Sequence, residues 1–435
     1  MVTGRRVWVN WGQNQSCRPE HVAYPGSPDE IAALVKTAAE AGRTVKVIGS
    51  GHSFTDIALT DGLMLSLRRC DRILDVDHST GLVKVEAGIT LASLNRELAD
   101  IGLAIETLGD IEYQSVAGAI STSTHGTGAR FHSIPSQIEA MELILADGNT
   151  LEISRSSDRD LFHSAQVGLG ALGVIATVTL RCVPAFNLYS EEQPWRLDEV
   201  LEQIDDLVAS NEHVDFYWFP HSEVAQTLIH NRTKEPAQPK GRLKTYYEDI
   251  LMENRMFNLV NWAGSLNQDW IPGLSRFVGS QIGRTATTDR SDRVFTNPRT
   301  VRFVEMEYAI PRSQAIPALR SVKELIKKKD FKVGFPIELR FLGPDDAFLG
   351  TAYGRDTAYL AVHVYYRLAF ESFFREVEAV MREMEGRPHW GKMHYRTAQD
   401  LRPLYPQWDR FLDVRDRLDP DRVFANEYLE RVLGP

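Results

Sequence analysis

The sequence predicts a protein of mixed helices and strands that folds as more than one domain. The chain has 435 residues, more than one ordinary hydrophobic core organises, so we expect two or three domains. Apolar residues make up 43% of the chain, which is typical of a globular protein and excludes wholesale disorder. Segments with helical spacing of apolar residues alternate with short strand-like runs through most of its length.

The N-terminal part of the chain has the clearest element boundaries. Ser27 to Glu30 form a helix start, in which a capping side chain precedes a proline and two acids near the positive end of the helix dipole. Gly42 ends this helix, and Pro184 marks the end of the first domain. Further strands are expected at 44–48, 72–77, 82–87 and 173–182, and a second helix at 91–98. Residues 141–154 predict a hairpin with Asp147-Gly148 at its turn.

The rest of the chain is less regular. Residues 186–300 carry many aromatic side chains and few clean repeats, and the polar stretch 234–244 with its two prolines predicts a loop. The later elements are expected as strands at 301–311, 335–341 and 358–366, helices at 313–329 and 370–385, and short helical pieces from residue 391 on.

Charge and cysteine content exclude several classes of protein. The formal net charge is −10 and no block of Lys and Arg stands out, so we expect no nucleic-acid partner. Cys17, Cys70 and Cys182 are odd in number and far apart, which predicts reduced thiols rather than disulfides or a metal site. No apolar run is long enough for a signal peptide or a spanning helix, so a soluble cytoplasmic protein without a membrane anchor is expected.

Three glycine-rich segments suggest a ligand that lies on the backbone. The first, Val47 to Phe54, reads VIGSGHSF and follows a predicted strand. It is not a Rossmann fingerprint, because Phe54 stands where the third glycine of GxGxxG would be. The turn can still direct backbone N–H groups to a phosphate, and His52 within it can reach a ligand. On spacing alone, a plain tight turn with a surface histidine is an equal alternative.

The second segment, SVAGAISTSTHGTG at 115–128, combines small side chains with hydroxyls that suit a pyrophosphate and a ribityl chain. A flexible linker is the alternative, which Val116, Ala117 and Ile120 disfavour. The third segment, GLGALGVI at 168–175, is either a loop leading into a core strand or a backbone wall for a flat ring.

Taken in this order, the three segments resemble the FAD-binding domain of the vanillyl-alcohol-oxidase-type flavoproteins. The segments YGRDT at 353–357, RPHWGK at 387–392 and DPDRVF at 419–424 resemble the sugar-1,4-lactone oxidase branch, which includes L-gulono-1,4-lactone, D-arabinono-1,4-lactone and alditol oxidases. The match covers essentially the whole chain. It implies an α+β fold with three parts: a two-subdomain FAD-binding domain of the PCMH type at 1–185, a cap domain with a large antiparallel sheet at 186–395, and a C-terminal segment at 396–435 that returns to the FAD domain.

The resemblance also implies which residues contact FAD. His52 corresponds to the covalent attachment point of the flavin 8α-methyl group, and a neutral imidazole nitrogen is a suitable nucleophile for that bond. The cofactor-binding residues are then expected to be Gly49, Ser50, Gly51, His52, Ser53, Ser115, Gly118, Ser121, Thr124, His125, Gly126, Gly128, Gly173, Val174 and, from the tail, Asn426.

The expected catalytic residues are Glu338, Arg340 and Lys392. Glu338 and Arg340 lie two apart in a predicted strand and therefore share a face, although such charges usually form a surface ion pair. The resemblance implies that Glu338 accepts hydrogen bonds from substrate hydroxyls and orients Arg340, which polarises the reacting oxygen. Lys392 would be a second cation there, and both cations would favour a developing alkoxide and a reduced, anionic flavin.

Four further residues are expected at the substrate. His363 and Tyr365 share a strand face, with a core histidine as the alternative. Gly109 and Asp110 match the position where this family controls the access of oxygen to the flavin, with a plain turn as the alternative. Glycine leaves room for O2, whereas Asp110 departs from the Ala-Ser of alditol oxidases and argues against a simple alditol specificity.

A metal site is not expected. His389 and His394 lack an HExxH pattern and a third ligand at useful spacing.

The implied reaction is FAD-dependent oxidation of a secondary alcohol on an aldono-1,4-lactone, by hydride transfer to flavin N5. With L-gulono-1,4-lactone or a related substrate and O2 as acceptor, the products would be H2O2 and a 2-keto lactone that enolises to an ascorbate-type compound. The alternatives are a dehydrogenase with a non-oxygen acceptor, an alditol or inositol oxidase, and a flavin-binding protein without alcohol chemistry. Glu338, Arg340 and Lys392 disfavour the last, because a binding module does not need them.

Overall fold

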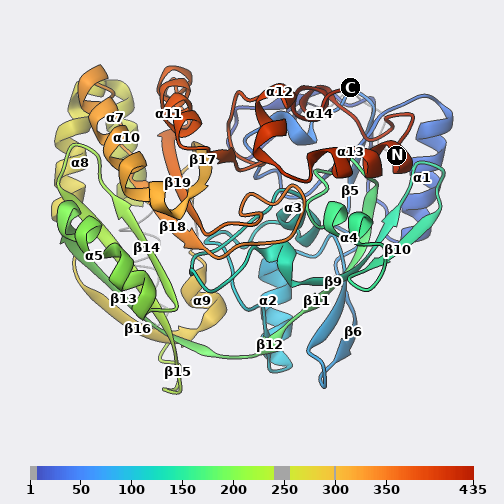
Figure 1. Cartoon of the computed structure of the whole chain (residues 1–435), viewed down its shortest axis with the longest axis horizontal. Coiled ribbons are helices and arrows are strands. Elements are labelled where there is room, and N and C mark those ends of the chain that lie inside the picture. Colours follow the sequence, from blue (N-terminus) through green and yellow to red (C-terminus); the bar gives the residue numbers. More distant parts are fainter. Residues whose placement is uncertain (1–6, 240–254, 298–299) are drawn as a thin grey trace.

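The protein consists of two lobes that meet along a central seam (Figure 1). The structure is a computed structural model, and it describes residues 7–239, 255–297 and 300–435. The N-terminal lobe contains a parallel and an antiparallel sheet, and the sheet lobe is built on one large antiparallel sheet. This arrangement confirms the α+β class.

The two main sheets of the N-terminal lobe have three and five strands, and two-stranded pairs β1 (Trp8–Val9) with β2 (Ser16–Cys17) and β8 (Leu103–Ala104) with β12 (Val183–Pro184) accompany them. The parallel sheet has the order β3 (His21–Ala23), β5 (Leu63–Ser66), β4 (Val45–Ile48). The antiparallel sheet has the order β10 (Thr150–Ser154), β9 (Ile138–Ile144), β11 (Val174–Arg181), β7 (Leu82–Glu86), β6 (Ile73–Asp77). The helices of this lobe are α1 (Pro28–Glu40), α2 (Leu91–Asp100), α3 (Val116–Ser121) and α4 (Arg159–Gln166). As predicted, the Ser27 side chain caps α1 by accepting a hydrogen bond from the backbone N–H of Glu30.

The sheet lobe contains eight strands, and every pairing in its sheet is antiparallel. The strand order is β16 (Thr285–Arg290), β13 (Asn187–Arg196), β15 (Val224–Thr233), β14 (His213–Trp218), β18 (Ile337–Leu342), β19 (Thr357–Tyr365), β17 (Phe303–Pro311), β20 (Arg387–Pro388). The helices of this lobe are α5 (Leu197–Ser210), α7 (Phe257–Leu266), α8 (Ile271–Ser280), α9 (Ser291–Phe295), α10 (Ala315–Lys329) and α11 (Glu371–Glu383).

The two faces of this sheet have different roles. Ile337, Leu339 and Phe341 of β18 belong to an apolar core shared with α5, α10 and α11. Because side chains alternate along a strand, Glu338 and Arg340 lie on the opposite face, toward the N-terminal lobe. One face of the sheet therefore provides stability, and the other carries polar side chains at the seam.

The end of the chain packs on the N-terminal lobe. Helices α12 (Ala398–Leu401), α13 (Trp408–Leu418) and α14 (Glu427–Leu433) lie over that lobe in Figure 1, and their apolar residues share its core. Arg431 of α14 also forms an ion pair with Asp56 at 2.9 Å.

The least regular part of the sequence is more structured than expected. Within 186–300 the structure contains β13, α5, β14, β15, α7 and α8, which the sequence analysis did not identify. The predicted loop at 234–244 is irregular over 234–239, and its remainder lies outside the described residues.

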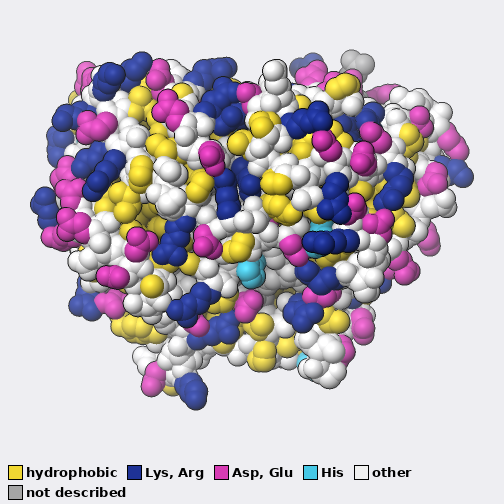
Figure 2. All heavy atoms as spheres, viewed as in Figure 1, with side chains coloured by type: hydrophobic (Ala, Val, Ile, Leu, Met, Phe, Trp, Pro, Cys, Tyr) yellow, Lys and Arg dark blue, Asp and Glu magenta, His cyan; other side chains and the backbone are white. Residues whose placement is uncertain are grey.

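The three cysteines are unpaired. Among the described residues, none of the helices combines the length and apolar character needed to cross a membrane. On the face shown in Figure 2, basic and acidic side chains are interspersed without a continuous basic area.

Candidate active site

A groove of about 470 Å³ runs through the N-terminal lobe and is walled largely by backbone and small side chains. All three glycine-rich segments contribute to it. The predicted cofactor residues that line it are Gly49, Ser50, Gly51, His52, Ser53, Ser115, Gly118, Ser121 and Gly173.

Two glycines of the groove wall leave no room for a side chain. A Cβ atom at Gly49 would lie 2.5 Å from the Ser115 Oγ atom, and one at Gly173 would lie 2.9 Å from the Ile144 carbonyl oxygen. Gly173 also has φ +148°, which disfavours any L side chain. A long space lined largely by backbone and small side chains fits an extended dinucleotide such as FAD, with the residues named above in position to contact it.

Lys46 is a groove residue that the sequence analysis missed. Its Nζ atom donates a hydrogen bond to the Phe424 carbonyl at 3.1 Å, which ties the groove to the C-terminal segment. Burial, together with the nearby Arg415, lowers the pKa of Lys46 to about 7. Lys46 lies between Val45 and Val47 in the strand that precedes the glycine turn, and this pattern was the signal in the sequence that could have identified it.

His52 lines the groove between two aromatic rings. Its ring centroid lies 5.3 Å from that of Trp11 and 6.3 Å from that of Tyr113. Burial, and then the charge of Lys392, lower the pKa of His52 to about 4, so the imidazole is neutral near pH 7.

A second, smaller cavity of about 110 Å³ lies at the seam and shares Gln114 with the groove. Its walls come from both lobes. The predicted residues that line it are Glu338, Arg340, Lys392, Gly109, Asp110 and His363, together with Thr124 and His125, which were expected at the cofactor. The structure thus brings all three predicted catalytic residues to one space.

Arg340 is surrounded by acids. Its Nε atom lies 2.5 Å from Glu338 Oε1 and 3.9 Å from Asp215 Oδ2, and its Nη2 atom lies 3.6 Å from Asp110 Oδ1. The Tyr217 hydroxyl donates to Glu338 Oε1 at 2.8 Å. Burial opposes the charge of Arg340, but Glu338 and Asp110 outweigh burial and raise the pKa of the guanidinium. A permanent cation is therefore held at this wall.

Lys392 and His363 share Glu305 as their partner. Lys392 Nζ forms an ion pair with Glu305 Oε2, and His363 Nε2 lies 3.5 Å from Glu305 Oε1. Burial favours a neutral Glu305, but Lys392 and then His363 outweigh it and lower the pKa of the carboxyl to about 2. Burial likewise opposes both cations, and Glu305 raises the pKa of Lys392 and of His363. Glu305 thus favours the charged form of both side chains.

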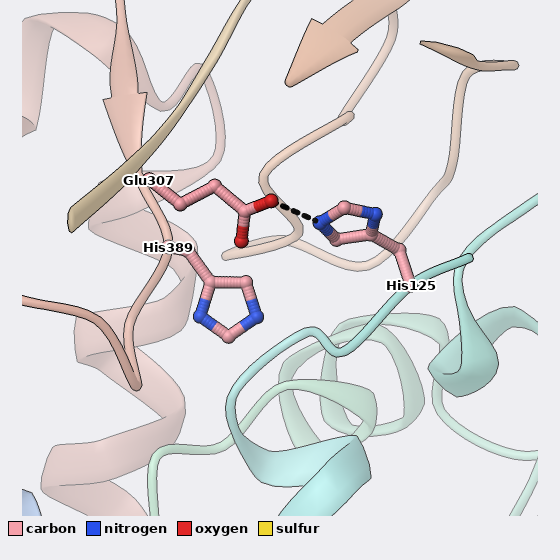
Figure 3. Close-up of side chains that lie close together, drawn as sticks. All are labelled: His125, Glu307 and His389. Atoms are coloured by element: carbon pink, nitrogen blue, oxygen red, sulfur yellow. Dashed lines mark ion pairs between the residues drawn. The ribbon is translucent and has the colours of Figure 1, made fainter. Parts of the chain in front are cut away.

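His125, Glu307 and His389 lie close together, with His125 on the N-terminal lobe and the other two on the sheet lobe (Figure 3). His125 Nε2 lies 3.4 Å from Glu307 Oε1, and its Nδ1 lies 2.9 Å from the Gly126 carbonyl oxygen, so each ring nitrogen faces an acceptor. His389 Nδ1 accepts from the Gly391 N–H at 3.1 Å. Burial lowers the pKa of His389 to about 3, so this ring is neutral, and its Nδ1 atom is already used as a hydrogen-bond acceptor. We interpret the cluster as a contact between His125 and Glu307 beside a neutral His389.

Five predicted residues lie elsewhere. The Tyr365 hydroxyl donates to Asn258 Oδ1 at 3.1 Å, outside the cavity that His363 lines. The Asn426 side chain caps α14, and its Nδ2 atom donates to carbonyls of the 56–59 turn. Gly126 packs on Leu108, Gly128 donates to the Phe341 carbonyl at 2.6 Å, and Val174 is buried in the core.

The sequence analysis missed Glu305, Glu307, Asp215 and Tyr217, and it considered His389 only as a metal ligand. The signal for the two glutamates was present, because they occur two apart in the predicted strand RFVEMEYAIP and share a face. Asp215 and Tyr217 lie in β14, a strand that was not predicted.

Comparison with known proteins agrees with this architecture. Residues 178–432 match the D-arabinono-1,4-lactone oxidase family, and residues 19–154 match the FAD binding domain family. The chain is 46% identical over 430 residues to the L-gulono-1,4-lactone dehydrogenase of Mycobacterium tuberculosis, with 99% of each chain covered. It is 34% identical over 431 residues to the L-gulonolactone oxidase of Bos taurus, with 98% of this chain and 97% of that one covered.

Among solved structures, a solvent-stable cholesterol oxidase superposes with a TM-score of 0.84 at 18% identity and covers 99% of this chain and 98% of its own. This likeness shows the fold. The family match covers more than half of the chain, and the related sequences align over nearly all of it. The protein belongs to the D-arabinono-1,4-lactone oxidase family and is an FAD-dependent oxidoreductase.

Proposed function

We propose that this protein oxidises a secondary alcohol of an aldono-1,4-lactone, L-gulono-1,4-lactone or a close relative, to the 2-keto lactone. The observation that carries the proposal is the small cavity beside the FAD groove, where Arg340 and Lys392 are both held as cations by buried carboxylates. The names of the related proteins, lactone oxidases and a lactone dehydrogenase, support this substrate class.

Bound FAD supplies the acceptor for the hydride that leaves the carbinol carbon. Arg340 and Lys392 stabilise the negative charge that develops on the substrate oxygen, because both are fixed in place before the reaction. Glu338 accepts hydrogen bonds from substrate hydroxyls while it orients Arg340, and Tyr217 fixes the Glu338 carboxylate. Asp110 offers a further acceptor for the polyhydroxylated substrate.

We propose O2 as the electron acceptor, with H2O2 as its product. Gly109 lines the cavity and has no side chain, which leaves room there for O2. A dehydrogenase with a non-oxygen acceptor is the second candidate, because the relative at 46% identity carries that name.

The decisive experiment follows the flavin absorbance at ~450 nm under anaerobic conditions. L-gulono-1,4-lactone is added to one sample and xylitol to another, and air is then admitted to both. We expect bleaching by the lactone, and rapid recovery in air for an oxidase. Slow recovery that a dye acceptor accelerates would favour the dehydrogenase. Bleaching by xylitol alone would replace the lactone with an alditol.

We further propose a covalent bond between His52 and the flavin. A neutral imidazole between Trp11 and Tyr113, in the wall of the groove, supports it, since the nucleophile must carry a lone pair.

The functional division that we propose is FAD binding by residues 1–185, substrate binding by 186–395 and a return of 396–435 to the first part. Three unpaired cysteines support a cytoplasmic location, and we propose no nucleic-acid partner.

A further inference from the structure

The cavity at the seam has an apolar end that takes no part in the proposed chemistry. Phe257, Phe303 and Phe335 line this cavity together with the charged residues that act on the substrate, and we call these three residues the apolar end. Phe303 and Phe335 are buried, at 7% and 5% exposure. A hydroxyl group placed against such rings loses its hydrogen bonds to water without replacing them. A site for a substrate with a hydroxyl on every carbon has no need of this wall.

The strand register fixes where the apolar end lies. Phe303, Glu305 and Glu307 occupy alternate positions of β17, so they share one face at steps of about 7 Å. Glu307 lies in the same row across the sheet as Glu338. Lys392 forms its ion pair with Glu305, one row closer to Phe303. The cavity wall therefore changes from charged to apolar along the strand direction.

The rings of the apolar end are packed against one another. The Phe335 ring centroid lies 4.9 Å from that of Phe257 and 5.6 Å from that of Phe303. Phe303 also packs edge-on against Trp11 of the N-terminal lobe, with centroids 5.2 Å apart. Contacts on several sides hold these rings in place, so the apolar end presents a fixed surface to the substrate.

The polar side chains of β19 that adjoin Phe303 already have partners. The His363 ring centroid lies 5.1 Å from that of Phe303. Its Nδ1 atom is 3.1 Å from the Pro336 carbonyl oxygen, and its Nε2 atom is 3.5 Å from Glu305 Oε1. Tyr365, the cross-strand neighbour of Phe303, donates its hydroxyl proton to a residue outside the cavity. Neither side chain therefore offers a free donor to a substrate hydroxyl at the apolar end.

We propose that the apolar end binds the terminal carbon of the substrate, and that the protein prefers 6-deoxyaldono-1,4-lactones to lactones that end in a hydroxymethyl group. The inference rests on the proposed function, because it takes the reacting alcohol to lie between Arg340 and Lys392. The side chain of the lactone then extends along the strands toward Phe303 and Phe335. A terminal methyl group gains from leaving water there, whereas a terminal hydroxyl group loses its hydrogen bonds.

The test compares L-gulono-1,4-lactone with 6-deoxy-L-gulono-1,4-lactone, which differ in a single hydroxyl group. The rate of anaerobic flavin reduction in the FAD-loaded protein, measured against lactone concentration, gives a Kd and a limiting rate for each lactone. We expect the Kd of the 6-deoxy lactone to be about tenfold lower, because an apolar pocket discriminates only modestly against one added hydroxyl group. The limiting rates should agree within about threefold, because the reacting carbon is the same.

Substitutions locate this preference in the cavity. Phe335→Gln places an amide at the apolar end and should bring the two Kd values within about twofold of each other. Phe335→Leu keeps an apolar side chain there and should retain the preference. Tyr365→Phe is the matched control and should also retain it, because Tyr365 lies on the same strand face as His363 but outside the cavity.

The possible failures are distinguishable. Equal Kd values in the wild type, or tighter binding of L-gulono-1,4-lactone, would overturn the inference while leaving lactone oxidation in place. A preference that survives Phe335→Gln would also overturn it, since the terminal carbon would then lie elsewhere. Flavin reduction by neither lactone would overturn the proposed function itself, and the inference with it. The comparison within the wild type does not require any variant to fold.

Discussion

The groove and the cavity are neighbours that share Gln114, yet they are built from different materials. Much of the wall of the groove comes from three short glycine-rich segments, each nearly contiguous in sequence, and the rest comes from side chains such as Tyr24, Lys46 and Arg68. The cavity is lined by single side chains from β14, β17, β18 and β19 and from the loop after β20, which face residues 109–125 of the N-terminal lobe. We propose that the groove holds FAD by its shape and that the cavity acts on a substrate by its charges. Substitutions should therefore affect binding in one and chemistry in the other.

The largest effect is expected for Arg340→Ala. It removes the cation that Glu338 orients, so flavin reduction by the lactone should slow by about 10³-fold. FAD content should be unchanged, because Arg340 does not line the groove. Stopped-flow reduction and the flavin-to-protein absorbance ratio separate the two readouts. Arg340→Lys should recover little, since a lysine cannot reproduce the guanidinium fork. An unchanged reduction rate would remove Arg340 from the catalytic residues.

The contrast between the two sites also explains what the sequence could predict. The groove was predictable from GSGHSF and its companions, because local backbone geometry is encoded in neighbouring residues. The Glu338–Arg340 pair was visible because strand periodicity places both on one face. The same logic applied to Glu305 and Glu307, but strand periodicity cannot tell that the partner of Glu305 is Lys392, 87 residues further along the chain.

The limits have physical causes. Strands β13, β14 and β15 were missed because polar and aromatic residues interrupt the alternation of apolar side chains along them. Tyr365 lies on the same face of β19 as His363. However, α7 packs at that end of β19, and the Tyr365 hydroxyl donates a hydrogen bond to Asn258 of α7. Asn426 was expected at FAD, yet an asparagine before a helix is also a good cap, and capping is the contact found.

Glu305→Gln should have the next largest effect, about 10²-fold on kcat/KM, because it leaves the buried Lys392 and His363 without their anionic partner. Since Glu305 raises the pKa of Lys392, the alkaline limb of the pH profile should move to lower pH. Folding lowers the pKa of Glu305 from its ordinary 4.5 to about 2. The ionised Glu305 carboxylate therefore stabilises the folded protein above pH 4.5, and this stabilisation is lost as the pH falls toward 2. The variant should lack this acid-dependent loss in thermal unfolding. An unmoved alkaline limb would show that Lys392 does not depend on Glu305.

Gly49→Ala tests whether the shape of the groove determines FAD affinity. The added Cβ would meet the Ser115 Oγ atom at 2.5 Å, so FAD affinity should fall by about tenfold. Combining it with Ser115→Ala removes the colliding atom and should restore part of the affinity. Titration of the apoprotein with FAD, followed by flavin fluorescence, measures both. A loss of kcat at full FAD occupancy would contradict the assignment of this glycine to cofactor shape alone.

His52→Ala should abolish any covalent flavin, since it removes the proposed nucleophile. Flavin fluorescence should then no longer follow the denatured protein band on a gel. Turnover should drop by only about fivefold with saturating FAD, because the rest of the groove still positions the cofactor. Trp11→Phe is a matched control that keeps a flanking ring and the bond. Fluorescence that persists in the His52 variant would assign the attachment to another residue.

The smallest effect is expected for Asp215→Asn. Burial raises the pKa of Asp215 to about 8, with Arg340 opposing and Glu338 and Asp110 reinforcing the shift, so the carboxyl is largely protonated at neutral pH. The variant therefore replaces a neutral acid with a neutral amide. Its kcat/KM at about pH 7 should stay within about twofold of the wild-type value. Because the folded pKa lies above the ordinary 3.8, the wild type loses stability as pH rises toward 8, whereas the amide does not. The Tm of the variant should therefore exceed that of the wild type at about pH 9. A large loss of activity at neutral pH would instead show that Asp215 is ionised and is a third carboxylate partner of Arg340, beside Glu338 and Asp110.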